Sequence, residues 1–368
     1  MEDTVRYDCR FFLGDRPCVH GGPCGGCDFY SPMGRRLLVI KLAAAGDVLR
    51  ATSVLPPLKE KYPDSHITWV ADENALPLVV GNPFVDRALP MGFESWLRLA
   101  AERFDTAICL DKEPRGGALL ESVTAGEKLG FGLTEWGTTR PVNDGARYDF
   151  ELGLSNERKF HENERTYPEI FCEIAEVDYA GDPYALHLPD RSIRHAREWL
   201  RTRELSGPLV GLNVGAGAVF ANKAWTEEGF AELARSVSRD LGGTAVILGG
   251  PEDRDRAEGV LDAAGDCAVD GETHELMDFA AIVASMDAVV TGDTMAMHMA
   301  IALRVPVVAI LGPTVPQEIA FYAPGRKVIS PAECAPCYRR ECDRTPTCME
   351  QIPAGEVLSA LREVLESE

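Results

Sequence analysis

The sequence predicts an α/β protein built from two Rossmann-like halves in tandem. Short apolar runs alternate with amphipathic helical stretches in two series, one on each side of about residue 190, and several runs end in glycine-containing turns. This alternation is typical of parallel sheets with helices on both faces. With 368 residues, the chain is long enough for two ordinary domains. A cleft between them would receive the carboxyl ends of the strands, where open parallel sheets bind ligands.

The first series follows a segment with little hydrophobic periodicity. Residues 1–32 contain four cysteines and five glycines, and we expect a Cys-rich knuckle there. The first domain, 33–190, then begins with the buried-strand run RRLLVIKL and a helix over 48–61, which the Pro-Pro pair inside it should kink or break. HITWVA, RALP and DTAICLD are further predicted strands, and 93–103 is a predicted helix.

The pattern becomes irregular between 138 and 190, apart from one amphipathic helix over 166–176, and it ends in the predicted linker LHLPDRS. The second domain, 191–330, resumes the alternation. Its predicted strands and helices are strands 208–214, 244–250, 287–291 and 307–311, and helices 226–241, 252–264, 274–285 and one from 294. Residues 331–368 form a Cys-rich tail with a closing helix over 354–365.

Composition excludes several classes of protein. The chain is 45% hydrophobic and 26% charged, as expected for a globular protein. It has no apolar run of membrane-spanning length, and its N-terminus lacks the order of a secretory signal, so we expect a cytoplasmic protein. A net charge of −21 argues against binding to nucleic acid, which requires clustered Lys and Arg.

Eight of the eleven cysteines form two tetrads, and each tetrad contains a C-x-x-C pair. Cys109, Cys172 and Cys267 stand alone in apolar contexts and are predicted core residues. A reducing compartment disfavours disulfides, so the tetrads are candidate structural metal sites, with zinc ahead of iron. Four thiolates leave no open position for a substrate, and we predict no catalytic metal. The tetrads are Cys9, Cys18, Cys24 and Cys27, and Cys334, Cys337, Cys342 and Cys348.

The most informative stretch is VVTGDTMAMHMAIALRVPVVAILG, which reads as strand, turn, helix and strand. Asp293 and Thr294 lie at the start of the predicted helix, where unpaired backbone N–H groups can hold a diphosphate or a sugar oxygen. His298 follows one helical turn later on the same face. A helix N-cap is the purely structural interpretation of Asp293 and Thr294.

Two further turns follow predicted strands. In Ala45-Gly46-Asp47, Gly46 permits a tight turn and Asp47 opens a helix, either as a general base that faces the cleft or as an N-cap. In NVGAGAVFANKAW, small residues let the backbone approach an anion, and a lysine can meet a diphosphate. This motif is not a P-loop, and a mobile loop with a solvated lysine is the alternative. The residues concerned are Gly215, Ala216, Gly217 and Lys223.

The turn in LGGPEDRDRAE places Glu252 at a helix start, where it can accept from ribose hydroxyls or serve the helix dipole. The D-x-D at Asp253 and Asp255 is discounted, because residues two apart on a helix do not share a face. The loop Gly312-Pro313-Thr314 follows the last strand and should close over the same crevice, unless it is a plain turn.

Taken together, KLAAAGD, NVGAGAVFANKAW, GGPED, GDTMAMHMA, VVAILGPT and the ending CAPCYRRECDRTPTCM resemble the heptosyltransferase family, glycosyltransferase family nine, over roughly residues 35–365. The resemblance implies a GT-B fold, with two Rossmann-like domains that bind the acceptor mainly with the first and the nucleotide-sugar with the second. It also implies a metal-independent, inverting transfer, typically from ADP-heptose to a lipopolysaccharide core sugar.

The resemblance also assigns roles to residues. Asp47 matches the catalytic aspartate that takes the acceptor proton, and Lys223 the lysine that stabilises the departing diphosphate. Glu252 matches an acidic residue near the ribose, and Asp293, Thr294 and His298 match the turn that holds the donor. Thr314 joins this donor set, and Gly46 and Arg50 are expected on the acceptor side. Met295, which stands where the family usually has glycine, is also expected in the donor set, and Ala43 and Ala44 replace frequent serines.

Between Arg35 and Asp64 there are six basic and three acidic residues, a local excess of three positive charges. This patch can meet a phosphorylated glycolipid at the inner membrane face, or it is a solvated helix surface. Two alternative functions remain at this point: a nucleotide-sugar epimerase of the same architecture, and a non-catalytic binding or assembly protein that uses the cysteine tetrads. An NAD-dependent dehydrogenase ranks last, because no G-x-G-x-x-G follows either first strand.

Overall fold

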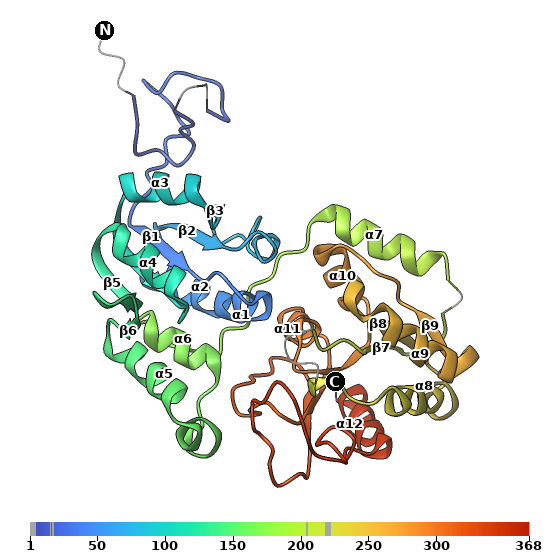
Figure 1. Ribbon diagram of the computed structural model, residues 1–368. Helices are drawn as coiled ribbons and strands as arrows, with labels where there is room; N and C mark the ends of the chain where they lie inside the picture. Colours follow the sequence, from blue (N-terminus) through green and yellow to red (C-terminus); the bar gives the residue numbers. More distant parts are fainter. Residues whose placement is uncertain (1–4, 15, 17, 204, 218–221, 368) are drawn as a thin grey trace.

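The computed structural model describes residues 5–14, 16, 18–203, 205–217 and 222–367. Its N-terminal half is built on a six-stranded sheet in the order β3-β2-β1-β4-β5-β6 (Figure 1). All pairs are parallel except β5 with β6. The strands are β1 Arg36–Ile40, β2 His66–Ala71, β3 Arg87–Pro90, β4 Arg103–Cys109, β5 Thr124–Leu133 and β6 Thr139–Pro141.

The C-terminal half is built on a second six-stranded sheet, which is parallel throughout, in the order β12-β11-β10-β7-β8-β9. Its central strands are buried along their length, as continuous apolar runs such as AVVTG and VVAIL require. The strands are β7 Leu209–Asn213, β8 Thr244–Leu248, β9 Ala268–Asp270, β10 Ala288–Gly292, β11 Val307–Leu311 and β12 Gly325–Ile329.

Both sheets have the doubly wound strand order, in which the chain starts in the middle and reverses direction once. The reversal lies between β1 and β4 in the first sheet and between β7 and β10 in the second. Ligands of open parallel sheets bind outside the carboxyl ends of the strands at this point. The predicted α/β architecture of two Rossmann-like halves is therefore confirmed, and the topology marks one such place in each half.

The helices of the N-terminal half include two that the sequence pattern did not indicate. The predicted helix over 48–61 is broken, as expected, by a short 3-10 turn at Thr52–Val54, and the two prolines occupy the first turn of the helix that follows. The region predicted as irregular contains α5 as well as the expected α6. Among the described residues, the α-helices of this half are α1 Ala45–Ala51, α2 Leu55–Lys61, α3 Phe93–Ala101, α4 Pro114–Ser122, α5 Asp144–Leu154 and α6 Tyr167–Ile174, and a π-helix, Arg158–Glu162, lies between the last two.

In the C-terminal half, α7 begins at Asp190, inside the predicted linker, and packs against α10. The turn predicted as the start of the helix after β8 is a separate 3-10 turn, Pro251–Asp253, and the α-helix begins at Arg254. The helices of this half are α7 Asp190–Arg201, α8 Glu227–Leu241, α9 Arg254–Ala264, α10 Leu276–Val283, α11 Met295–Ala302 and α12 Ala354–Glu366.

The two halves meet where α1 packs against α11 (Figure 1). The segment that connects them is attached to both halves. The backbone N–H of Ala185 donates to the Thr52 hydroxyl of the first half, and the buried Tyr184 ring packs edge-on against Tyr322 of the second. No helix in the described part of the chain is long and apolar enough to cross a membrane.

The Cys-rich N-terminal segment projects from the first half, at the end away from the second half (Figure 1). Its described residues form almost no regular structure, apart from an isolated antiparallel β-bridge between the backbones of Cys9 and Pro32. Cys9 is the one buried residue among them. An ion pair between Arg10 and Asp86, at 3.1 Å, attaches it to the first half. The Cys-rich tail instead packs on the second half, where Cys348 and Met349 join the core under α12.

Candidate active site

Asp47 occupies the first turn of α1, immediately beyond the carboxyl end of β1. A carboxylate is favoured there because the helix N-terminus carries partial positive charge. Its carboxylate forms an ion pair with the guanidinium of Arg50 at 2.7 Å, and the Arg50 guanidinium lies 3.6 Å from the centre of the Tyr167 ring. The Asp47 side chain remains 37% exposed, so a substrate can reach it.

The charges around Asp47 keep it ionised. Burial by itself would raise its pKa, but the positive charges of Arg50 and Lys41 lower it to about 2. The charge of Lys223 in the C-terminal half lowers the pKa of Asp47 further. The carboxylate is therefore available as a proton acceptor across the neutral pH range.

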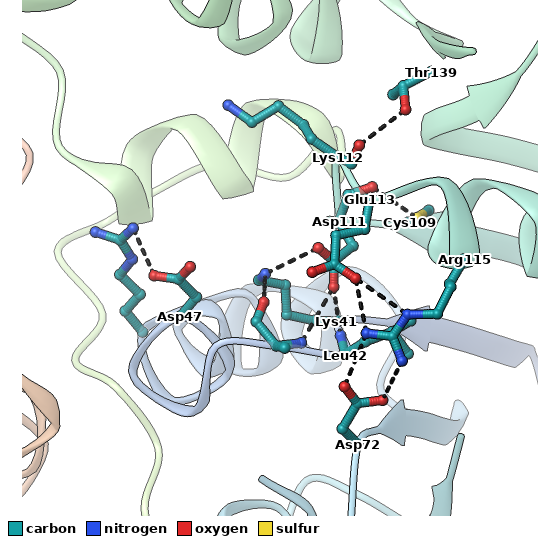
Figure 2. A network of polar contacts seen from close by, with 12 residues as sticks. Lys41, Leu42, Asp47, Asp72, Cys109, Asp111, Lys112, Glu113, Arg115 and Thr139 are labelled. Atoms are coloured by element: carbon teal, nitrogen blue, oxygen red, sulfur yellow. Dashed lines mark hydrogen bonds and ion pairs between the residues drawn. The ribbon is translucent and has the colours of Figure 1, made fainter. Parts of the chain in front are cut away.

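Asp111 is a second carboxylate at this place, and the sequence motifs did not single it out. It follows β4, the strand beside β1, and accepts from the backbone N–H of Leu42 at 2.6 Å. Its other oxygen lies 3.3 Å from the Lys41 ammonium, which also donates to the Ala43 carbonyl (Figure 2). This buried pair fixes the loop between β1 and α1, and thereby the position of Asp47.

Beside these residues lies a cavity of about 430 Å³, which we call the N-terminal cavity. Every residue that lines it belongs to the N-terminal half. They are Lys41, Ala43, Ala44, Asp47, Arg50, Leu110, Asp111, Lys112, Glu113, Pro114, Asp149, Tyr167 and Phe171.

A larger cavity of about 770 Å³, the C-terminal cavity, lies at the carboxyl ends of β7, β8, β9 and β10. Glycine-rich backbone forms much of it. Its lining residues are His195, Asn213, Gly215–Gly217, Gly249–Pro251, Asp253, Thr273–Leu276, Asp278, Phe279 and Thr294–Ala296. The Asn213 amide fixes the floor, because it donates to the Thr291 hydroxyl at 3.1 Å and to the Thr294 hydroxyl at 3.2 Å.

Five of the predicted donor-site residues line this cavity: Gly215, Ala216, Gly217, Thr294 and Met295. Glu252 is exposed and is not among the lining residues, whereas its neighbour Asp253 is. Thr314 is buried and also lies outside the lining. Residues 218–221 of the motif NVGAGAVFANKAW lie outside the described residues.

Asp253 shows why Gly215 is required. Its carboxylate accepts from the backbone N–H of Gly250 at 2.9 Å, which closes the turn after β8. A Cβ at Gly215 would lie 2.2 Å from the same carboxylate. Only glycine allows the two loops to approach this closely and shape the cavity floor.

Lys223, Asp293 and His298 form a charged group beside the C-terminal cavity. The Lys223 ammonium lies 3.3 Å from the Asp293 carboxylate, and His298 Nε2 lies 3.7 Å from the other oxygen of that carboxylate. Burial would raise the pKa of Asp293, but the charge of Lys223 lowers it below its usual value. Burial, together with the charge of Arg50, lowers the pKa of His298 to about 4, so its imidazole is neutral.

His298 contributes to the contact between the halves. A Cβ at Gly46 would lie 2.8 Å from His298 Cδ2, so the imidazole packs directly on the α1 backbone. The structure therefore brings Gly46 and Asp47 of one predicted motif together with His298 of another.

The cysteine tetrads lie outside both cavities. Cys9, Cys18, Cys24 and Cys27 all line one small pocket in the N-terminal segment, together with aromatic side chains. Among the residues the structure describes, all eleven cysteines are free, and no three His, Cys, Asp or Glu side chains are arranged to hold a metal ion.

Two doubly wound domains face each other here, with an ionised carboxylate on one and a glycine-rich cavity at a helix N-terminus on the other. Together they have the arrangement of the GT-B fold. The family model of glycosyltransferase family 9 (heptosyltransferase) matches residues 95–347. The chain belongs to this family.

Individual relatives agree with this assignment. Lipopolysaccharide heptosyltransferase 1 of Pseudomonas aeruginosa is 25% identical over 335 residues, which cover 85% of this chain and 88% of the relative. The solved family 9 glycosyltransferase of Veillonella parvula superposes with a TM-score of 0.70 at 21% identity, over 90% of this chain and 97% of that one. The E. coli ADP-heptose lipopolysaccharide heptosyltransferase II gives 0.65 at 20% identity, over 90% and 98%.

Proposed function

We propose that this glycosyltransferase is an inverting, metal-independent enzyme that moves a heptose from ADP-heptose to a glycolipid or polysaccharide acceptor, such as the lipopolysaccharide core. The observation that carries the proposal is the position of Asp47, which lines the N-terminal cavity. It also lies close enough to the facing half for the charge of Lys223 to lower its pKa. The heptose and the ADP follow the family and the E. coli heptosyltransferase described above.

The chemistry needs one displacement. An acceptor hydroxyl in the N-terminal cavity gives its proton to the Asp47 carboxylate while its oxygen attacks the anomeric carbon of the donor. The bond from that carbon to the diphosphate breaks, ADP leaves, and the configuration inverts because attack and departure occur on opposite faces.

The leaving group gains negative charge, and the C-terminal half can meet it without a metal. Lys223 supplies a positive charge next to the turn that precedes α11. The backbone N–H groups at the start of α11 point out of the helix end at Thr294–Ala296, where a phosphate is electrostatically favoured. In this proposal Asp253, which lines the cavity, takes the place beside the ribose that was expected of Glu252.

The test is transfer with purified protein, ADP-heptose and an acceptor mixture from bacterial core oligosaccharide. We expect ADP release that depends on acceptor, an inverted anomeric linkage in the product, and no effect of a chelator. A product that forms from the donor alone would favour an epimerase instead. No binding of ADP in calorimetry would reject the donor site.

We also propose that each cysteine tetrad holds a structural metal, zinc before iron. For the first tetrad the support is physical: the N-terminal segment has almost no buried core, and small units of this kind need a cross-link to fold. For the second tetrad the support is its C-x-x-C spacing. Elemental analysis of the purified chain should find one metal ion per intact tetrad, and Cys24→Ser should remove one of them. A metal-free chain with the same thermal stability after treatment with a chelator would contradict this proposal.

A further inference from the structure

The N-terminal cavity, which the proposed function assigns to the acceptor, has a charge pattern that restricts what can bind there. Three cationic side chains line it, and each is already paired with a carboxylate that also lines it. The pairs are Arg50 with Asp47 at 2.7 Å, Lys112 with Asp149 at 2.7 Å, and Lys41 with Asp111 at 3.3 Å.

A fourth carboxylate, Glu113, also lines the cavity. Its partner is Arg115, at 2.8 Å, which does not line the cavity and also binds Asp72 at 3.0 Å (Figure 2). The lining therefore holds four carboxylates and three cations, and adding Arg115 with Asp72 leaves the balance unchanged. The cavity carries one net negative charge.

The basic patch expected from the sequence does not compensate this charge, because five of its six basic side chains are paired with carboxylates. The sixth, Lys61, donates to a backbone carbonyl and does not line the cavity. Besides the pairs made by Lys41 and Arg50, the remaining contacts are Arg35 to Glu127 at 3.7 Å, Arg36 to Glu102 at 2.5 Å, Lys59 to Asp86 at 3.1 Å and Lys61 to the Glu176 carbonyl at 2.6 Å. Four of the acidic partners lie outside the stretch 35–64, so the charge count within that stretch did not include them: Glu127, Glu102, Asp86 and Asp111.

The facing half is balanced in the same way. Lys223 pairs with Asp293, and in the proposed reaction it also serves the diphosphate of the donor. Lys159, which belongs to the first half and lies in the π-helix Arg158–Glu162, is 3.9 Å from the buried Glu318 of the facing half. His298 is neutral, because its pKa is lowered to about 4. An anion in the N-terminal cavity would therefore find no surplus of positive charge on either side.

We propose that the acceptor group bound in the N-terminal cavity is a neutral sugar, with free hydroxyls and without phosphate or carboxylate. This inference rests on the proposed function and deepens it. Hydroxyls can donate to the four carboxylates without disturbing the existing ion pairs. A phosphate or carboxylate would have to displace a paired carboxylate or remain unpaired in a partly buried site, and both are costly.

The experiment compares matched acceptors. Octyl glycosides of neutral sugars are tested beside their 6-phosphates and their uronic acids, each with ADP-heptose, and kcat/KM is measured for each. We expect neutral members to exceed their anionic counterparts by at least about tenfold. Equal or better use of the anionic members would overturn the inference while the proposed transfer stands.

ADP binding, measured on the same protein, distinguishes failure of the proposed function from failure of the neutral-acceptor inference alone. Loss of ADP binding rejects the proposed function itself. Retained ADP binding, with no transfer to any member of the panel and no calorimetric binding of the neutral glycosides, rejects the neutral acceptor alone.

A variant gives an independent test. Glu113→Gln removes the negative charge that is least tied to the interior, since this side chain is 47% exposed. We expect the ratio of kcat/KM for a phosphorylated acceptor to that for its neutral partner to rise roughly fivefold. Glu121→Gln is the matched control, because Glu121 lies on the same half, pairs with Arg140 and does not line the cavity. An unchanged ratio in Glu113→Gln, or an equal rise in the control, would contradict the inference.

Discussion

The two cavities of this glycosyltransferase lie on sheets of the same strand order but are lined by different kinds of groups. The C-terminal cavity is shaped by backbone, with glycines at two turns, and lacks Lys and Arg among the described residues that line it. The N-terminal cavity is lined by charged side chains held in pairs. Backbone groups suit a ligand part that never changes, such as a diphosphate, whereas paired side chains can be altered one at a time to change specificity.

The sharpest test of this division is Asp47→Asn. The amide keeps the shape of the side chain but cannot accept the acceptor proton, so we expect the transfer rate to fall roughly 100- to 10,000-fold. ADP binding should be retained, because the C-terminal cavity is untouched.

The control for this variant is Asp144→Asn, since the Asp144 side chain on α5 is fully exposed. Transfer rates measured under single-turnover conditions and calorimetry with ADP check both variants. Equal loss of ADP binding and of rate in Asp47→Asn would break the comparison, because it would mean that the two cavities do not work separately.

Lys223→Ala should weaken ADP binding, which Asp47→Asn should leave intact. Removal of the ammonium takes away a charged partner of the diphosphate worth about 1.5–3 kcal/mol, which corresponds to a Kd for ADP raised roughly 10- to 100-fold. Binding of a neutral acceptor should not change. Calorimetric titration with ADP and with the acceptor measures both, and an ADP affinity equal to that of the parent protein would exclude Lys223 from the donor site.

Gly46→Ala addresses the contact between the two halves. The added methyl group would meet the His298 ring at 2.8 Å, and we expect a loss of about 1–3 kcal/mol in the free energy of unfolding from overpacking. Thermal or denaturant unfolding measures the loss. In Gly46→Ala with His298→Ala, the two effects should be less than additive, because the second change makes room for the first. Strict additivity would show that the two residues do not touch.

The smallest expected effect is a pH dependence of stability. His298 has a pKa lowered to about 4 in the folded protein, so the unfolded chain binds more protons between that value and the ordinary histidine pKa. Stability should therefore fall as the pH drops from 7 to 5, by about 1–2 kcal/mol from this residue. In His298→Asn that part of the fall should vanish in urea unfolding at the two pH values.

Asp47 does not interfere with this measurement. Its pKa is lowered to about 2, so its stabilising ion pair is fully present above the ordinary aspartate pKa and is lost only in stronger acid. A pH dependence unchanged by His298→Asn would mean that this imidazole is not held neutral by burial.

The fold could be predicted from the sequence wherever strands and turns have strong patterns. The runs at β1, β7, β8, β10 and β11 are apolar and end in glycine or aspartate turns, so both the fold and the position of Asp47 followed from them. β5 was missed because its sequence, TAGEKLGFGL, mixes glycine with charge. α5 was missed because its apolar positions are few and weakly periodic.

The site was harder to predict than the fold, because its charge balance depends on residues far apart in the chain. Asp111 lies 69 residues from Leu42, whose backbone it holds, and Asp149 lies 37 residues from Lys112. One signal was available: Asp111 ends the predicted strand DTAICLD, next to the first strand in a doubly wound sheet. The roles of Glu252 and Thr314, and the contact of the basic stretch with a membrane, stay predictions.

The connecting segment also has a mechanical consequence. Ala185 is hydrogen-bonded to the first half and Tyr184 packs against the second. These two contacts restrict the motion of the connecting segment, so it does not act as a free hinge. The packing of the His298 ring on Gly46 is a second contact that holds the two halves together. Two halves held by such contacts lose little conformational freedom when a ligand binds, so the entropic cost of binding is smaller. Its overall dimensions in solution should differ little between the empty and the ADP-bound protein.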